Sequence, residues 1–528
     1  MKINIQTPPS FKNYPMDQMS LMPQSFSEKI PSKHIVRTIN EAVEGIDLDS
    51  LIARYKGGGT SSYHPKMMLK VLVYAYSQRI YSSRRIAKAL REDITFMWLS
   101  GENTPDFRTI NDFRGKRMKA VIDDVFTAVL EYLIENGYVK LENYFVDGTK
   151  LEANANKGKV VWAKRRETYE NKVREQIQGL LTQIEQANEE EQAEYGNADL
   201  EELGETSQED MNSERLKQRI GELNDRLRQK TKPAKRVRSA LKKLEGDCLP
   251  RLEKYEHQSE LLAGRNSCST TDSDATCMLM KEDRGAQKPW PKPAYNVHAG
   301  TEGQFIVGFS VHGRTGDTTC LIPHLEQLEQ GLGRLPDKII ADAAYGSEEN
   351  YAYLEEHHAE NYLKYNTFYQ DTRQHRKTDK IPKRQYRSDS FPYDAEKDEF
   401  TCPANKRLQY VMTSPYISEN GYHTERRHYE CEECQGCPLK GDCTKAPGNR
   451  QIWISLKLMA YRREARENLT SEEGKKLRAK RSVEVETIFG HIKHNMGIRR
   501  FMLRGKDKVK TEWGLICMAI NMQKMAAA

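Results

Sequence analysis

Two short apolar runs that each end in an aspartate place the strongest constraint on how this chain folds. Residues 143–147 carry Tyr, Phe and Val before Asp147 and a glycine, and residues 338–342 end in Asp342 before small residues and another glycine. Such runs favour buried strands. A carboxylate at the end of a buried strand is costly unless a charge meets it. One isolated case would suggest a solvated turn, but the repetition indicates two aspartates that share a cation. Mg²⁺ prefers carboxylate oxygens and water as ligands.

Length and composition limit the class of protein but do not identify its function. The chain has 528 residues, of which 30% are charged and 37% hydrophobic, with a net charge of +7. That length allows two to four domains and a large core. The charge is mixed, which permits nucleic-acid binding through local patches. We expect no membrane partner, because no run approaches the length of a membrane span and the N-terminus lacks a signal-peptide core. We therefore expect a cytoplasmic protein.

The N-terminal part is predicted to be helical. Residues 1–60 read as an arm, and residues 61–138 carry helical patterns, including a helix that opens at Ser82. A helix-turn-helix laid against DNA and a plain helical bundle fit these residues equally well. In the first case, the side chains that would contact DNA are Arg84, Arg85 and Lys88.

Residues 161–262 interrupt the strand pattern. Their apolar residues recur with the 4-3-4 spacing of a helical seam. We expect an inserted helical hairpin or coiled coil that serves as a solvated spacer. On either side, residues 139–160 and 263–364 contain strands near 276–280, 294–299 and 305–311, a hairpin turn at 300–303 and a helix at 318–330. This order predicts a mixed α/β core, with a mixed sheet flanked by helices.

Residues 365–455 form a polar, Cys-rich insert, and residues 456–528 are helical and basic. Five cysteines lie in the insert, and four thiolates suffice for one structural Zn²⁺. We predict Cys402, Cys434, Cys437 and Cys443 as the ligands and Cys431 as the spare; free thiols in a loop are the alternative.

These motifs together resemble the DDE transposases of bacterial insertion sequences. The resemblance rests on Asp147 in Phe-Val-Asp-Gly-Thr, Asp342 in Ala-Asp-Ala-Ala-Tyr-Gly, and Glu486 six residues before Lys493. It implies an RNase H-like catalytic core, an all-α N-terminal DNA-binding domain that includes Arg108, and a zinc-ribbon-like insert. Where many relatives have a Tyr upstream of the glutamate, this chain has Arg478.

The resemblance further implies DNA transposition. The enzyme would bind the inverted-repeat ends of its element as double-stranded DNA, cleave a phosphodiester and join the freed 3′ hydroxyl to target DNA. Asp147, Asp342 and Glu486 would bind Mg²⁺, with Mn²⁺ as an alternative, and Lys493 would hold a phosphate. Because two ends must be cut together, we expect a homodimer on DNA. The resemblance also implies a bacterial protein associated with the nucleoid. Further basic residues that would bind DNA are Arg481, Arg499, Arg500 and Arg504.

Rival functions are a regulator derived from a transposase that lost catalysis, and a metal-dependent nuclease without a joining step. The third acid is also a choice between two residues. Glu484 and Glu486 lie about 200° apart on a helix expected to begin near Ser482, so one metal site uses one of them. Glu486 belongs to a small, polar row, whereas Glu484 is expected to contact an Arg or His.

Overall fold

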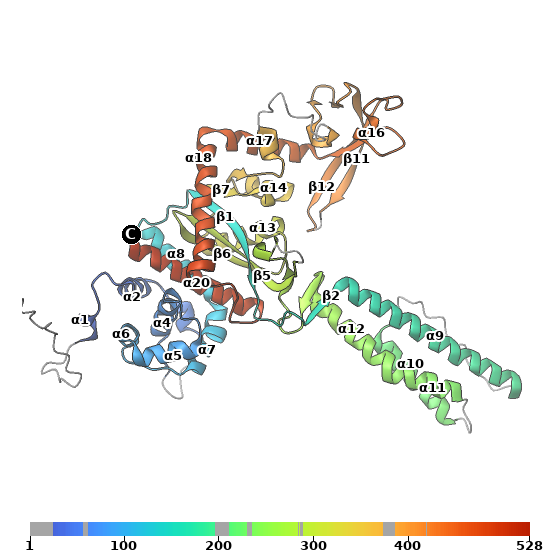
Figure 1. Cartoon of the computed structure of the whole chain (residues 1–528), viewed down its shortest axis with the longest axis horizontal. Helices are drawn as coiled ribbons and strands as arrows, with labels where there is room; N and C mark the ends of the chain where they lie inside the picture. Colours follow the sequence, from blue (N-terminus) through green and yellow to red (C-terminus); the bar gives the residue numbers. More distant parts are fainter. Residues whose placement is uncertain are drawn as a thin grey trace, which may run out of the picture.

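The computed structural model describes residues 25–55, 62–195, 211–229, 235–283, 285, 289–372, 386–418 and 420–528. A central sheet with helices around it carries three other parts: a group of N-terminal helices, a long helical arm and a small β-rich region (Figure 1). None of the described helices is both long and apolar enough to cross a membrane.

The central sheet is built around strand β1 (Asn143–Glu152). Its neighbours are β5 (Lys292–Glu302), which runs antiparallel, and β7 (Lys338–Ala341), which runs parallel. The parallel pairing continues from β7 to β8 (Glu360–Leu363), while β6 (Phe305–His312) and β4 (Thr276–Met278) pair with β5. The predicted mixed sheet is therefore confirmed.

The sequence predicted that the first strand ends at Asp147, and this prediction is wrong. β5 pairs with β1 from Phe145 through Glu152, so β1 continues well past Asp147. β7 is shorter, and its partners on β1 stop at Phe145, opposite Ile340. The same register offset puts Asp147 level with Asp342. Both side chains thus lie at the carboxyl end of β7. Beyond this point β1 no longer pairs with β7.

A two-residue turn joins β5 to β6. Gly303 and Gln304 both have positive φ, at 58° and 62°, and the flanking residues pair directly. Tight hairpin turns with two such residues match the natural twist of the strands. The predicted hairpin is confirmed, although its turn is shorter than expected.

Three helices bury the sheet. Trp513 of the C-terminal helix is fully buried and donates a hydrogen bond from its indole N–H to the His298 carbonyl, at 3.1 Å. The covering helices are α8 (Ile122–Glu135), α13 (Leu321–Leu332) and α20 (Lys506–Ala527). The helix predicted at 318–330 is thus present as α13, preceded by a short 3₁₀ turn.

The N-terminal helices share this core. Part of the segment expected to be an arm is helical, and its Val36 and Ile39 are fully buried in the main hydrophobic cluster; residues 1–24 lie outside the described chain. These helices are α1 (Phe26–Lys29), α2 (Ile35–Gly45), α3 (Asp49–Ile52), α4 (Pro65–Ser77), α5 (Ser83–Glu92), α6 (Ile94–Ser100) and α7 (Phe107–Asp112). Helix α4 is buried along most of its length, while α5 keeps a charged outer face.

The inserted arm projects away from the sheet (Figure 1). It consists of α9 (Ala163–Tyr195), α10 (Ser213–Gln229), α11 (Lys235–Lys243) and α12 (Leu249–Leu262). The predicted apolar seams are buried and form a separate hydrophobic cluster that includes Val173, Ile177, Leu216 and Leu241. A two-stranded ribbon, β2 (Val160–Trp162) with β3 (Ser267–Ser269), ties the base of the arm together.

The polar, Cys-rich insert contains a second sheet. Its five antiparallel strands are β9 (Tyr393–Asp394), β10 (Glu399–Thr401), β11 (Arg407–Ile417), β12 (His423–Cys431) and β13 (Gln451–Ile454). The long hairpin β11–β12 has polar or exposed residues on both faces, so it lacks the alternation that marks a strand. Helices α17 (Leu456–Thr470) and α18 (Glu472–Arg481) lead from it back to the core.

Candidate active site

Three acids predicted from the sequence surround one arginine. Arg481, the last residue of α18, places Nη2 2.9 Å from Oδ2 of Asp147 and 3.7 Å from Oδ2 of Asp342. Its Nη1 lies 3.4 Å from Oε1 of Glu486. Asp342 also accepts a hydrogen bond from the N–H of Ala344, at 2.9 Å, which fixes the turn after β7. The fold therefore brings acids from three distant segments together around one guanidinium.

Burial sets the electrostatics of this site. The side chain of Asp147 is 17% exposed. Burial raises its pKa to about 6; Arg481 opposes this shift, and the nearby Asp342 charge adds to it. A buried carboxylate that is hard to ionise requires positive charge close by. In this structure Arg481 supplies that charge.

The donor set matches a hard cation. Carboxylate oxygens are the ligands that Mg²⁺ prefers, and Oδ2 of both aspartates lies within 4 Å of one nitrogen of Arg481. In the described part of the chain, no three His, Cys, Asp or Glu side chains are grouped closely enough to hold a metal ion. In this structure each of the three acids forms an ion pair with Arg481. The side chain of Glu486 is 56% exposed. A cation and Arg481 would compete for the same oxygens.

The two glutamates separate as the helical register predicts. Glu484 is 2% exposed and accepts a hydrogen bond from the backbone N–H of Gln304, at 2.6 Å. Its ionic partner is Lys480, at 3.2 Å, so the expected Arg or His contact is wrong. Glu486 points instead to Arg481. An apolar stripe between the two sides of the helix is buried; it contains Val485, Phe489, Ile492 and Met496.

The helix that carries these residues does not begin at Ser482. Helix α18 runs on into a π-helical turn, Ser482–Glu486, then into α19 (Thr487–Gly490) and a second π-helical turn, His491–Asn495. Such turns insert an extra residue and recur at functional sites. Here one contains Glu486 and the other Lys493.

Lys493 is held by an acid in this structure. Its side chain is 11% exposed, and Nζ lies 2.9 Å from Oε1 of Glu282. Glu282 belongs to the 3₁₀ turn between β4 and β5. A phosphate bound by Lys493 would have to compete with this carboxylate.

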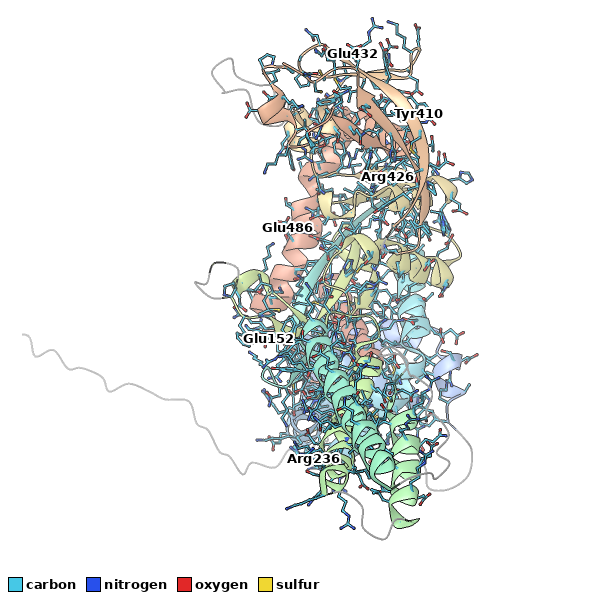
Figure 2. All side chains as sticks on the ribbon, turned by 90° about the vertical axis from the view of Figure 1, so that its right-hand side faces the viewer. Glu152, Arg236, Tyr410, Arg426, Glu432 and Glu486 are labelled. Atoms are coloured by element: carbon cyan, nitrogen blue, oxygen red, sulfur yellow. The ribbon has the colours of Figure 1, made fainter. Side chains whose placement is uncertain are left out.

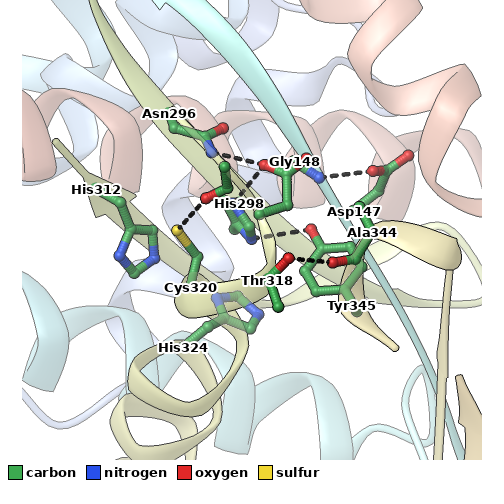
Figure 3. Close-up of polar contacts among 12 residues, drawn as sticks. Asp147, Gly148, Asn296, His298, His312, Thr318, Cys320, His324, Ala344 and Tyr345 are labelled. Carbon is green, nitrogen blue, oxygen red and sulfur yellow. Dashed lines mark hydrogen bonds and ion pairs between the residues drawn. The ribbon is translucent and has the colours of Figure 1, made fainter. Parts of the chain in front are cut away.

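A network of polar side chains, most of them buried, lies beside Asp147 and Gly148 (Figure 3). Asp317 accepts a hydrogen bond from Nδ2 of Asn296, at 2.6 Å, and lies 3.5 Å from Nε2 of His298. Burial alone would raise the pKa of Asp317, but the contacts with His298 and Asn296 lower it overall. On the other side, His298 Nδ1 is 3.1 Å from the hydroxyl of Tyr345, in the second motif. The network thus links the turn after β6 to the turn that carries Asp342.

This network also explains the motif glycine after Asp147. A Cβ on Gly148 would lie 2.7 Å from Nε2 of His298, closer than side-chain atoms approach. Neither His298 nor Asp317 was predicted from the sequence. A signal existed, because Asp317 follows Gly316 soon after a predicted strand, much as Asp342 follows β7.

The five cysteines of the insert line one small cavity. All are free thiols. The Sγ atoms of Cys402 and Cys434 each accept a backbone N–H, from Lys406 and Arg450 respectively, both at 3.3 Å. Cys431 instead donates its S–H to the carbonyl of Glu433. A thiolate ligand accepts hydrogen bonds, as the Sγ atoms of Cys402 and Cys434 do in this structure.

The basic residues predicted to bind DNA lie in different settings. Arg481 is 10% exposed and belongs to the acid site. Arg84, Arg85, Lys88 and Arg108 are exposed on α5 and α7, where Arg84 and Arg108 flank the Phe107 ring. Arg499 is exposed, while Arg500 and Arg504 donate to backbone carbonyls just after β1.

Two family models match parts of this chain. Residues 401–526 match a family model described as a transposase DDE domain, and residues 24–116 match one described as a transposase domain (DUF772). Both models describe transposase domains, and a DDE domain in general implies an enzyme that cleaves DNA and transfers strands. The two matches together support a DDE-type transposase of an insertion sequence. Neither the curated proteins nor the solved structures gave a significant match.

Proposed function

We propose that this chain is a DNA transposase that binds the inverted-repeat ends of its element and carries out metal-dependent cleavage and strand transfer. The observation that carries the proposal is the convergence of Asp147, Asp342 and Glu486 on Arg481. The central sheet supports an RNase H-like core, because β1 lies between the antiparallel β5 and the parallel β7.

Each acid has a distinct part in the proposal. Two divalent ions about 3.5–4 Å apart neutralise the attacking and leaving oxygens in this type of phosphoryl transfer. Asp147 would bind both ions; this role is supported by its being the most buried of the three and level with Asp342. Asp342 and the exposed Glu486 would each hold one ion. Arg481 would give up at least one carboxylate partner and would then be free to meet a phosphate.

The structural zinc remains a proposal of its own. Cys402, Cys434, Cys437 and Cys443 would draw together around Zn²⁺ when it binds; this is supported by their lining the same cavity and by the backbone N–H donors that two of them already accept. Four thiolates leave no open position for chemistry, so this ion would stabilise the insert.

The test starts with the DNA that flanks the gene. Terminal inverted repeats found there would supply labelled end DNA, which is incubated with the full chain and Mg²⁺. We expect cleavage at the element end and joining of the 3′ end to a target, with both products absent for Asp342→Ala.

Two rival outcomes can be told apart in the same assay. End binding without cleavage by the wild-type chain would identify a regulator that lost catalysis. Cleavage without joining, when pre-cut ends are supplied, would identify a nuclease. We expect two copies of the chain per pair of ends, measured by light scattering of the DNA complex.

A further inference from the structure

A large groove separates the hairpin β11–β12 from the catalytic core. Its volume is about 1530 Å³, which exceeds the roughly 300–1,000 Å³ of small-molecule pockets. The hairpin side presents alternate residues, including Tyr416, Tyr422 and Arg426, and the opposite side is one face of α17. Figure 2 shows Arg426 and Tyr410 on this hairpin. The groove therefore has room for more than a small molecule between its two facing sides.

The groove lining is strongly cationic. Seven arginines line it, against four acids. The acids are engaged: Glu348 accepts from Thr424, Glu349 from Asn420, Asp371 from Thr367, and Asp389 pairs with Arg387.

Five of the arginines have no such compensation. Within the described chain, none of the following forms an ion pair with an Asp or Glu: Arg314, Arg426, Arg462, Arg463 and Arg466. Nε of Arg462 is also buried without a hydrogen-bond partner there. Uncompensated guanidinium groups around a cavity point to an anionic occupant.

Aromatic rings alternate with these charges. Trp453 lines the groove and is 59% exposed, with its indole stacked on His428 at 4.9 Å between ring centres. Arg426 lies over the ring of Tyr416, at 3.3 Å to its centre. Trp162 adds a second exposed ring, while the ring of Tyr416 is half-buried. Arginines interleaved with exposed aromatic faces are the features that bind single-stranded nucleic acid.

The groove begins beside the acid site. Thr318 lines it and donates a hydrogen bond to the carbonyl of Ala344, at 2.6 Å, two residues after Asp342. Ser347, which also lines it, caps helix α14 (Glu348–Glu356) just after that turn. A strand lying in the groove would therefore reach the turn that holds Asp342.

We propose that this groove binds a single-stranded segment of DNA next to the cleavage site. This inference rests on the proposed function. A duplex does not fit the chemistry of the lining as well. Its base faces are already stacked on one another, so the rings of Trp453 and Tyr416 would have no partner. A separated strand offers both its phosphates to the arginines and its base faces to the rings.

The test measures binding of a fluorescent oligothymidylate to the full chain in buffer without Mg²⁺ or Mn²⁺, so that no cleavage occurs and the proposed structural Zn²⁺ is kept. Trp453→Ala should weaken binding about fivefold or more, because it removes one stacking platform. Arg463→Ala with Arg466→Ala should flatten the salt dependence by about 1.4, the slope of two phosphate contacts on a single strand. Binding of duplex end DNA should change by less than twofold in both variants.

The matched control is Arg236→Ala with Arg238→Ala, which removes the same charge from the exposed surface of α11 (Figure 2). It should bind oligothymidylate like the wild type. The proposal is overturned if the wild type does not bind the single strand, if the groove variants bind like the wild type, or if duplex binding falls by the same factor. Failure of the proposed function would show separately, as wild-type cleavage by Asp342→Ala.

Discussion

The acid site and the cysteine cluster are two candidate metal sites built in opposite ways. The acids come from residues 147, 342 and 486, and the register of the central sheet brings them together. The cysteines come from residues 402–443, and the insert encloses them in a hydrophobic cluster of its own. One site depends on the whole fold, and the other on a single local sheet.

Their electrostatics differ as well. Arg481 already offsets the charge of the acids, so the core does not need a metal ion to keep them together. Lys406, Lys440 and Arg450 also line the cysteine cavity, but burial outweighs the opposing charge of Arg450 and raises the pKa of Cys443. Metal loss should therefore stop the chemistry of the first site and loosen the fold of the second.

The largest expected effect is on cleavage. Asp147→Ala or Asp342→Ala should lower the cleavage rate by at least about a hundredfold, because a carboxylate that holds the cation beside the reacting phosphate is lost. Binding of end DNA should survive, since neither side chain lies on the basic surfaces. Gel shift and cleavage with Mg²⁺ on one preparation measure both, and wild-type cleavage in either variant would sink the assignment.

Two single variants, at Glu486 and at Glu484, test which glutamate belongs to the acid site. Glu486→Gln should eliminate Mg²⁺-dependent cleavage with little change in melting temperature, because its side chain is largely exposed. Glu484→Gln should keep most cleavage but lose about 1–3 kcal/mol of unfolding free energy, because its buried carboxylate caps Gln304. Cleavage rates and urea unfolding check the pair, and the reverse pattern would move the third ligand to Glu484.

The cysteine side is tested by removing two ligands. Cys434→Ser with Cys437→Ser should lose one bound Zn²⁺ per chain and melt at a lower temperature, because metal binding contributes folding energy. Elemental analysis and thermal melting measure these effects. Cys431→Ser is the control and should keep the ion. Metal-free wild-type protein of full stability would end the zinc proposal.

The smallest effect concerns the exposed face of α5. Replacing Arg84, Arg85 and Lys88 by Gln should flatten the salt dependence of end binding by about 0.9 for each phosphate that these side chains neutralise in the wild type. Cleavage of bound DNA should continue, since these residues lie far from the acids in sequence and on another helix. Unchanged affinity and slope would show that this region is a helical bundle with another role.

Residue patterns predicted much of the core but not its contacts. Strand runs, the hairpin and the helical seams follow from local periodicity, and the spacing of Glu486 and Lys493 marked the third acid. The position of Arg481 between the acids was not predictable, because it depends on how α18 meets β1 and β7. The same applies to Lys493, whose partner Glu282 lies in a distant turn. The second sheet was missed because its long hairpin is solvated on both faces.

The most direct test of the central claim is a count of Mn²⁺ bound by the DNA-free chain, followed by electron paramagnetic resonance. If Asp147, Asp342 and Glu486 form one cation site, the wild type and Glu484→Gln should bind Mn²⁺, and Arg481→Gln should bind it more tightly because the competing guanidinium is gone. Asp147→Asn with Asp342→Asn should bind none at that site. Equal Mn²⁺ binding by the double variant and the wild type would contradict the assignment of these acids as a cation site.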